Sequence, residues 1–246
     1  MKTYQNFNVD VHNCDVNGNL RVSVLLKLMQ ETSTKQLENS LISQKKLMEA
    51  GKTYVLSRLN ISIYRQAQAG DTIEVSTWPC ESRGLSLTRC YQARIDGNII
   101  AEAITVWGVI DITTRQLFRV SNLPVDIECE EPLELDFPTR IHIPNDMSLG
   151  LVGERTVVYS DLDINGHMNN TNYPDMICDF IPEMENKRVL MMGISYISEA
   201  RGGTPLKVYL GKGDGQYYIR TVGSDGETNC EAVVMLEEIP IYERIK

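Results

Sequence analysis

The sequence predicts an α+β fold built from two related halves, in each of which an antiparallel sheet wraps around a helix. Three observations predict this fold. The chain contains an internal repeat whose anchor segments keep the same order in both halves. A short polar turn followed by an apolar helix pattern occurs once in each half. Segments rich in β-branched and aromatic residues follow each helix, with glycine-containing turns between them.

The repeat begins at a polar turn, Asp15-Val16-Asn17-Gly18-Asn19, which returns as Asp163-Ile164-Asn165-Gly166-His167. Two further anchors follow. Because the anchors keep their order, a duplication explains them better than chance does. The further anchors pair Ile61-Ser62-Ile63-Tyr64 and Gly70 with Ile194-Ser195-Tyr196-Ile197 and Gly203, and Asp96-Gly97 and Glu102-Ala103 with Asp225-Gly226 and Glu231-Ala232.

In the first half, apolar residues recur at helical spacing from Leu20 to Met29. This pattern predicts a helix from residue 20 to about residue 39, and a second helical piece is expected over residues 44–50. Strands are expected over residues 54–64, 72–78, 86–95 and 99–111, with a hairpin turn at Asp96-Gly97.

In the second half, Pro174 is compatible only with the first turn of a helix, so a helix is expected to begin between residues 170 and 173. Strands are expected over residues 189–197, 206–212, 216–223 and 229–239. The apolar face of the helix is formed by Tyr173, Met176, Ile177, Phe180 and Ile181.

The repeat divides the chain into an N-terminal unit, residues 1–125, and a C-terminal unit, residues 151–246. Residues 126–150 are expected to be an exposed connector, because prolines remove backbone donors and like charges repel one another. The prolines of residues 121–150 are Pro124, Pro132, Pro138 and Pro144, and the acidic residues of this stretch include Asp126, Glu128, Glu130, Glu131, Glu134 and Asp136.

Composition excludes several classes of protein. With 42% hydrophobic and 23% charged residues in 246 positions, the chain has globular rather than collagenous or disordered composition. It has no apolar run long enough for a membrane span and no signal-peptide pattern, so we expect a cytoplasmic protein. The six cysteines form no CxxC pair and are expected to be reduced, and neither a metal site nor a cofactor is predicted. The net charge of −9 disfavours binding to nucleic acid.

The second polar turn carries the candidate chemistry. Residues 160–170 combine two aspartates, three asparagines and a histidine immediately before an apolar helix. Such residues also cap helices and build turns, so a purely structural role is the alternative. A carboxylate that deprotonates water, an imidazole that assists it and an amide that binds an oxyanion together suit hydrolysis of an activated acyl group. No serine-hydrolase elbow, Walker, Rossmann or HExxH motif is present.

The repeat favours the chemical role over the structural one. The position of His167 holds Asn19 in the first half, and the position of Glu199 holds Gln66. An amide cannot act as a general base at neutral pH. The duplication therefore predicts one active site, in the second half, and one degenerate site.

At these residues the chain resembles the acyl-ACP thioesterases of plant plastids and bacteria, whose pattern is close to Asp-Leu-Asp-x-Asn-x-His-Val-Asn-Asn-x-x-Tyr. The matching segment here runs from Asp161-Leu162-Asp163 to Asn169-Asn170 and Tyr173. The resemblance extends over most of the chain and includes Gln5-Asn6-Phe7, Gln30-Glu31-Thr32, Val75-Ser76-Thr77-Trp78 and Val106-Trp107.

The resemblance implies a tandem double hot-dog fold and an enzyme that hydrolyses the thioester of a fatty acyl chain on acyl carrier protein. The release of free fatty acid would terminate fatty acid synthesis. The resemblance implies that Asp163, Asn165, His167 and Glu199 are catalytic. The implied partner is acyl carrier protein with its phosphopantetheine-linked acyl chain, and the first half would shape the acyl pocket. Either a monomer or a homodimer is expected.

One departure from the family pattern bears on the mechanism. Plant members carry a cysteine directly after the glutamate, whereas this chain has Ala200. A cysteine nucleophile at this position is therefore excluded, and water attack assisted by Glu199 and His167 is favoured. Direct attack by Glu199 is the other possibility.

Other functions are compatible with the same motifs. The alternatives are an acyl-CoA thioesterase of the hot-dog superfamily, a non-catalytic acyl-binding hot-dog protein and a double hot-dog hydratase. For the acyl-ACP reaction, an acidic chain must bind an acidic carrier, so docking requires a local basic patch. Its candidates are Lys45, Lys46 and Lys52, or Arg83 and Arg89.

Overall fold

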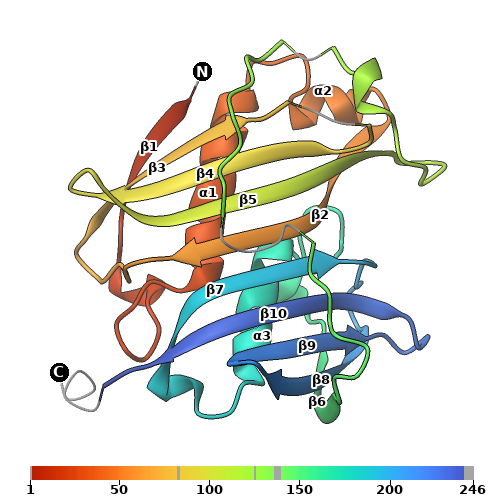
Figure 1. Cartoon of the computed structure of the whole chain (residues 1–246). Coiled ribbons are helices and arrows are strands. Elements are labelled where there is room, and N and C mark those ends of the chain that lie inside the picture. The colour runs from red at the N-terminus through yellow and green to blue at the C-terminus, as the bar shows by residue number, and fades with distance from the viewer. Residues whose placement is uncertain (1, 82–83, 125, 136–139, 241–246) are drawn as a thin grey trace.

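The computed structural model describes residues 2–81, 84–124, 126–135 and 140–240, whose strands form one 10-stranded antiparallel sheet (Figure 1). The elements of the first half are β1 (Thr3–Asn8), α1 (Val22–Leu37), α2 (Gln44–Glu49), β2 (Lys52–Ile63), β3 (Thr72–Pro79), β4 (Leu87–Ile95) and β5 (Asn98–Asp111). Those of the second half are β6 (Gly150–Thr156), α3 (Tyr173–Asp179), β7 (Lys187–Tyr196), β8 (Pro205–Gly213), β9 (Gln216–Val222) and β10 (Thr228–Glu238).

The two halves have the same strand order and meet at the β2–β7 pair. Outward from this junction, the order is β2, β5, β4, β3, β1 on one side and β7, β10, β9, β8, β6 on the other. The junction is antiparallel, with Arg58 opposite Ser195 and Ser62 opposite Met191. The repeat in the sequence is therefore a repeat in structure, and the predicted α+β class is confirmed.

A helix covers one face of each half of the sheet, α1 in the first half and α3 in the second (Figure 1). α1 buries Leu25 and Met29 against the sheet, as its periodicity predicts. α3 begins at Tyr173 directly after a 3-10 turn at Asn170–Asn172, as predicted, but ends already at Asp179. Phe180 and Ile181 therefore pack into the core from beyond its C-terminus. Among the described helices, none is both long enough and apolar enough to cross a bilayer.

Each predicted strand is present, with its ends moved by a few residues. Asp96 and Gly97 have φ angles of 50° and 77°, which suit a two-residue hairpin turn between β4 and β5. The sequence pattern does not predict the edge strands β1 and β6. β1 alternates half-buried and exposed residues, and β6 contains Gly150 and Gly153, so neither contains a run of buried β-branched residues.

The connector differs from the expected exposed linker. It runs along the sheet face opposite the helices, where Figure 1 shows it as a green trace. Its acidic side chains mostly face solvent as expected, but its apolar side chains pack onto the sheet because this face is also apolar. Pro138 and Asp136 lie outside the described residues. Leu133 and Leu135 pack against Trp78, Cys80, Cys90 and Ile104, and buried Ile141 and Ile143 pack against Tyr218 and Val233.

Candidate active site

The polar turn of the second half is held by one aspartate. Oδ1 of Asp163 accepts hydrogen bonds from the backbone N–H groups of Asn165 (2.8 Å) and His167 (3.2 Å). Gly166, between them, has a φ of 77°, a left-handed value that favours glycine. Asp163 therefore fixes the backbone that carries His167, and its Oδ2 accepts from Nδ2 of Asn165 at 3.3 Å.

The first half repeats this arrangement. Oδ1 of Asp15 accepts from the N–H groups of Asn17 (2.9 Å) and Asn19 (3.0 Å). The next residue, Leu20, donates its N–H to the carbonyl of Ala67 at 2.8 Å. Because the loop aspartate is present and similarly bonded in both halves, its position does not by itself require a role in chemistry.

His167 and Glu199 meet in the second half. Nε2 of His167 lies 3.3 Å from Oε2 of Glu199, and the two side chains are 17% and 34% exposed. The turn is tied to the chain that follows β7, because the N–H of Met168 donates to the carbonyl of Ala200 at 2.8 Å. A β-bridge also joins His167 to Arg201. This places an imidazole beside a carboxylate that water can reach.

The first half contributes Arg115 to the same place. The turn after β5 is closed by Asp111, whose Oδ1 accepts from the N–H groups of Thr113 and Thr114. From this turn Nη2 of Arg115 donates to Oε2 of Glu199, and this hydrogen bond raises the pKa of Arg115. Sequence reasoning did not identify Arg115, because no local signal marks a residue that reaches the site through pairing of β2 with β7.

The equivalent amides of the first half have different contacts. Asn19 is buried, and Nε2 of Gln66 donates to the carbonyl of Val189 at 2.9 Å. Nδ2 of Asn17 donates to the carbonyl of Glu185 at 3.0 Å. Gln66 and Asn17 thus bind backbone of the second half, so the first-half site serves as a contact between the halves.

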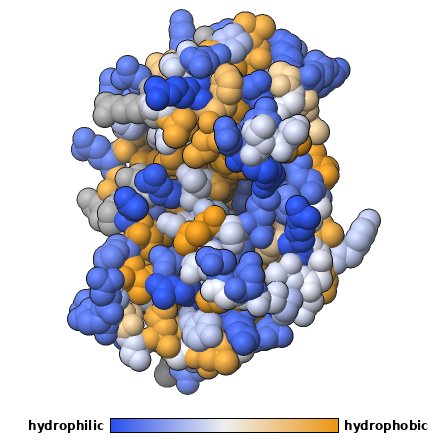
Figure 2. All heavy atoms as spheres, turned by 90° about the vertical axis from the view of Figure 1, so that its right-hand side faces the viewer, coloured by the Kyte–Doolittle hydropathy of each residue, from blue (hydrophilic) through white to orange (hydrophobic). Residues whose placement is uncertain are grey.

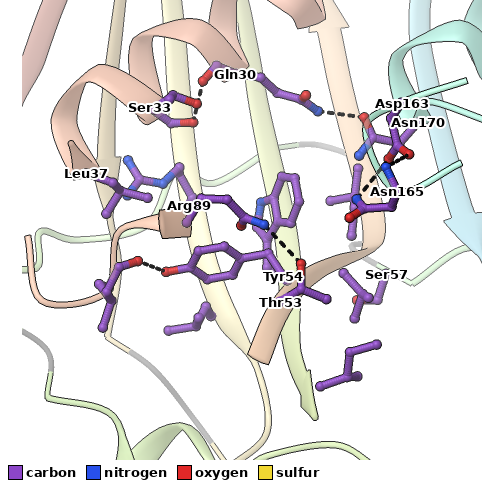
Figure 3. Close-up of a pocket in the computed structure, with 18 of the residues that line it drawn as sticks. Gln30, Ser33, Leu37, Thr53, Tyr54, Ser57, Arg89, Asp163, Asn165 and Asn170 are labelled. Atoms are coloured by element: carbon purple, nitrogen blue, oxygen red, sulfur yellow. Dashed lines mark hydrogen bonds between the residues drawn. The ribbon is translucent and has the colours of Figure 1, made fainter. Parts of the chain in front are cut away.

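A cavity of about 1600 Å³ extends from the His167–Glu199 pair into the first half. Figure 2 shows the face on which the ends of β5 and β7 lie, where the surface is hollowed between the two halves. The cavity is lined by α1, α2, β2 and β4, and all four residues predicted for the site line it: Asp163, Asn165, His167 and Glu199. In the close-up of Figure 3, Asp163, Asn165 and Asn170 lie at one side and Leu37 and Arg89 at the other.

The prediction is wrong for one of the docking residues. Arg89 was expected to contribute to an exposed basic patch, but it is only 7% exposed and lines the cavity. Its strand, β4, faces α1 at this position, which periodicity alone did not reveal. Lys45 and Lys46 are exposed on α2, Lys52 is half-buried with its Nζ donating to the carbonyl of Ala50, and Arg83 lies outside the described residues.

Two related half-sheets, each with its helix, define a tandem double hot-dog protein with a His–Glu pair at the mouth of a long cavity. Two family models match this chain. The model of the acyl-ACP thioesterase N-terminal domain matches residues 1–126, and the model of the acyl-ACP thioesterase C-terminal domain matches residues 150–237. The chain belongs to the acyl-ACP thioesterase family.

Solved structures agree with this assignment. An acyl-ACP thioesterase from Bacteroides thetaiotaomicron superposes with a TM-score of 0.87 at 26% identity, covering 96% of this chain and 98% of that one. A 12:0-ACP thioesterase from Umbellularia californica has a TM-score of 0.82 at 16% identity, covering 96% and 97%, which shows the shared fold.

Several curated relatives are chloroplast proteins of plants. The chain is 24% identical over 226 residues to an acyl-[acyl-carrier-protein] hydrolase of Cuphea viscosissima, covering 82% of this chain and 53% of the relative. It is 29% identical over 147 residues to an oleoyl-acyl carrier protein thioesterase of Arabidopsis thaliana, covering 53% of this chain and 39% of the relative. The chain thus spans about half the length, or less, of these relatives.

Proposed function

We propose that this chain hydrolyses the thioester of fatty acyl-acyl carrier protein and releases free fatty acid and the carrier. The observation that carries the proposal is the 3.3 Å approach of His167 Nε2 to Glu199 Oε2 at the mouth of the cavity. Family membership supports the same reaction. The acyl chain would occupy the cavity, and phosphopantetheine would enter from the side of the partly exposed His167–Glu199 pair.

In this proposal Glu199 acts as the general base. Its carboxylate takes a proton from water as the water oxygen attacks the thioester carbon. The carbon–sulfur bond then breaks, and the proton passes to the leaving pantetheine sulfur. His167, beside the carboxylate, orients the water or donates to the reacting oxygen, and the amide of Asn165 stabilises negative charge on that oxygen.

Two further residues act through these groups. Asp163 is a positioning residue, because its hydrogen bonds hold the backbone of His167. Arg115 holds the carboxylate of Glu199 through its ion pair and thereby fixes its orientation. One chain supplies both Arg115 and Glu199, so the proposed site is complete in a single chain.

Glu199→Gln and His167→Ala test the proposal. Each should lower kcat about 10²- to 10⁴-fold in a free-thiol release assay with acyl-acyl carrier protein. The matched control is Asn19→Ala, which removes the side chain equivalent to His167 in the first half and should leave kcat unchanged. Wild-type turnover in the first two variants would contradict the assignment.

The carrier is the second part of the proposal. Parallel assays with acyl-CoA separate the proposed function from that of an acyl-CoA thioesterase, since only the carrier differs. We propose that exposed Lys45 and Lys46 of α2 help to dock the acidic carrier, because Lys45 also lines the cavity. We also propose that the reaction takes place in the cytoplasm, where the six cysteines would stay reduced.

A further inference from the structure

The cavity contains a buried cation that the proposed chemistry does not use. Arg89, on β4, is 7% exposed. Its Nη1 donates to Oε1 of Gln36 on α1 and to Oγ1 of Thr77 on β3, the latter at 3.2 Å. Both acceptors are uncharged. Its hydrogen bonds to the described residues all leave from this one nitrogen.

Carboxylates are present in the cavity but do not pair with Arg89. Within the described part of the chain, no ion pair of 4.0 Å or less includes Arg89, whereas Glu38 pairs with Lys35 and Glu199 with Arg115. The carboxylate residues that line the cavity are Glu31, Glu38, Glu49, Asp163 and Glu199.

A guanidinium in this position needs a further acceptor. Arginine stays protonated in proteins and carries five N–H donors. A buried charge without a partner of opposite charge is strongly unfavourable unless hydrogen bonds satisfy it. The two neutral acceptors bind only Nη1, so the N–H groups of Nε and Nη2 can donate to a ligand that enters the cavity.

Two other polar residues that line the cavity, Tyr54 and Gln44, already have partners in the protein, whereas the buried Oε1 of Gln5 has none among the described residues. Tyr54 donates its hydroxyl hydrogen to the carbonyl of Ile42 at 2.6 Å, and Nε2 of Gln44 donates to Oγ1 of Thr53 at 3.0 Å. Burial raises the pKa of Tyr54 to about 12, and the positive charge of the nearby Arg89 opposes this rise. Arg89 therefore keeps hydrogen-bond donors that a ligand in the cavity can use.

Arg89 lies far from the reacting centre. It is opposite Thr105 on β5, and Thr105 is opposite Leu59 on β2. Leu59 is in turn opposite Ile194 on β7, the strand that leads to Glu199. Three strand spacings of about 4.8 Å place β4 about 14 Å from β7 across the sheet. Figure 3 shows Arg89 and the Asp163–Asn165 turn at opposite sides of the cavity.

We propose that Arg89 binds an oxygen acceptor, a hydroxyl or a carboxylate, on the part of the acyl chain remote from the thioester. The enzyme would thus select oxygenated acyl chains over plain hydrocarbon chains. A plain chain would bring methylene groups to the guanidinium and leave its free donors without acceptors. The inference rests on the proposed thioesterase function, because it requires the thioester to lie at Glu199.

The test compares acyl-carrier thioesters of equal length that are unsubstituted, hydroxylated at the far end or carboxylated at the far end, over several lengths. Wild-type kcat/KM should favour an oxygenated chain about 10- to 100-fold at the length that reaches Arg89, the range expected for hydrogen bonds to a charged group. A larger effect for the carboxylate than for the hydroxyl would identify charge pairing as the source. Preference for the unsubstituted chain at every length would overturn the inference.

Arg89→Met should abolish the preference, and Arg94→Met is the matched control. Arg94 is on the same strand, does not line the cavity and donates to Oε1 of Gln92 at 2.6 Å, so its replacement should keep the preference. Retained preference in folded Arg89→Met would also overturn the inference. If Arg89→Met does not fold, Arg89→Lys, which keeps the charge but loses the planar fork, should reduce the preference. Absence of hydrolysis with every thioester would instead contradict the proposed function.

Discussion

Replacing Asp163 or Asp15 by alanine separates the structural work of the polar turns from the chemistry. Each aspartate accepts two backbone N–H groups with one oxygen, at 2.8 and 3.2 Å for Asp163 and at 2.9 and 3.0 Å for Asp15. The two substitutions therefore remove nearly the same interactions from the two halves. Only the turn at Asp163 carries His167, so only that substitution should affect the reaction.

The expected loss of stability follows from these hydrogen bonds. A bond to a charged acceptor contributes about 1.5–3 kcal/mol, and both turns are partly solvated, so each alanine substitution should cost about 2–3 kcal/mol in total. For a chain of this size each kcal/mol lowers Tm by about 2–4 °C, so Tm should fall by about 4–12 °C in both variants. Asparagine keeps an acceptor without the charge, and the Asp→Asn variants should lose about half as much.

Activity should respond differently in the two halves. Asp163→Ala releases the backbone of His167, and a misplacement of about 1 Å can cost about 10² in rate. Asp15→Ala should leave kcat unchanged at a temperature where both variants are folded. Thermal unfolding and steady-state thiol release measure the two effects on the same samples. Loss of activity in Asp163→Ala without loss of Tm would refute the structural role, and equal inactivation by Asp15→Ala would refute the asymmetry of the halves.

Arg115→Ala should lower kcat for the acyl thioester yet destabilise the protein by less than about 1 kcal/mol, because its ion pair with Glu199 is exposed; a large fall in Tm would contradict this. Stability should also fall as pH rises above about 10, because the pKa of Tyr54 is raised to about 12 in the fold and the unfolded chain loses the proton first; chemical denaturation at pH 8 to 12 measures it. Exposed Cys129 should react with an alkylating reagent before Cys178, whose pKa burial raises to about 12, and mass spectrometry identifies the order.

Charge reversal at Lys45 and Lys46 tests the docking surface. The double variant should raise KM for carrier-bound substrate and leave a small pantetheine thioester unaffected, because only the carrier has the acidic surface that these exposed lysines would bind. The matched control is Lys52→Glu, since Lys52 is half-buried over the ring of Phe118. Equal KM values for the double variant and the wild type with both substrates would exclude this surface.

Local patterns in the sequence predict most of the secondary structure. Helix periodicity and Pro174 locate the starts of the helices, and glycine turns separate the strands correctly. The edge strands β1 and β6 are missed because edge strands lack the continuous buried pattern that marks central ones. The connector was predicted to be exposed because it is rich in charged residues and prolines. Its apolar residues instead pack onto the sheet, because the sheet offers them an apolar face.

The candidate site, too, is predicted from the sequence only in part. The repeat pairs His167 with Asn19 and Glu199 with Gln66, and the equivalent hydrogen bonds of Met168 to Ala200 and of Leu20 to Ala67 support this pairing. The sequence also leads to the family, since the polar motif is contiguous. It does not reveal the contact of Glu199 with the first half, nor does it distinguish a surface arginine from a buried one.

By itself, then, the sequence determined the duplication, the order of the elements and the half in which the His–Glu pair lies, because each follows from motifs that are short and contiguous in the chain. The tertiary structure alone decided what lies around that pair. Pairing of β2 with β7 brings Arg115 onto Glu199, and the approach of α1 to β4 encloses Arg89 at the far end of the cavity. Such contacts join residues far apart in sequence, and packing of the whole sheet, rather than any local pattern, sets their geometry.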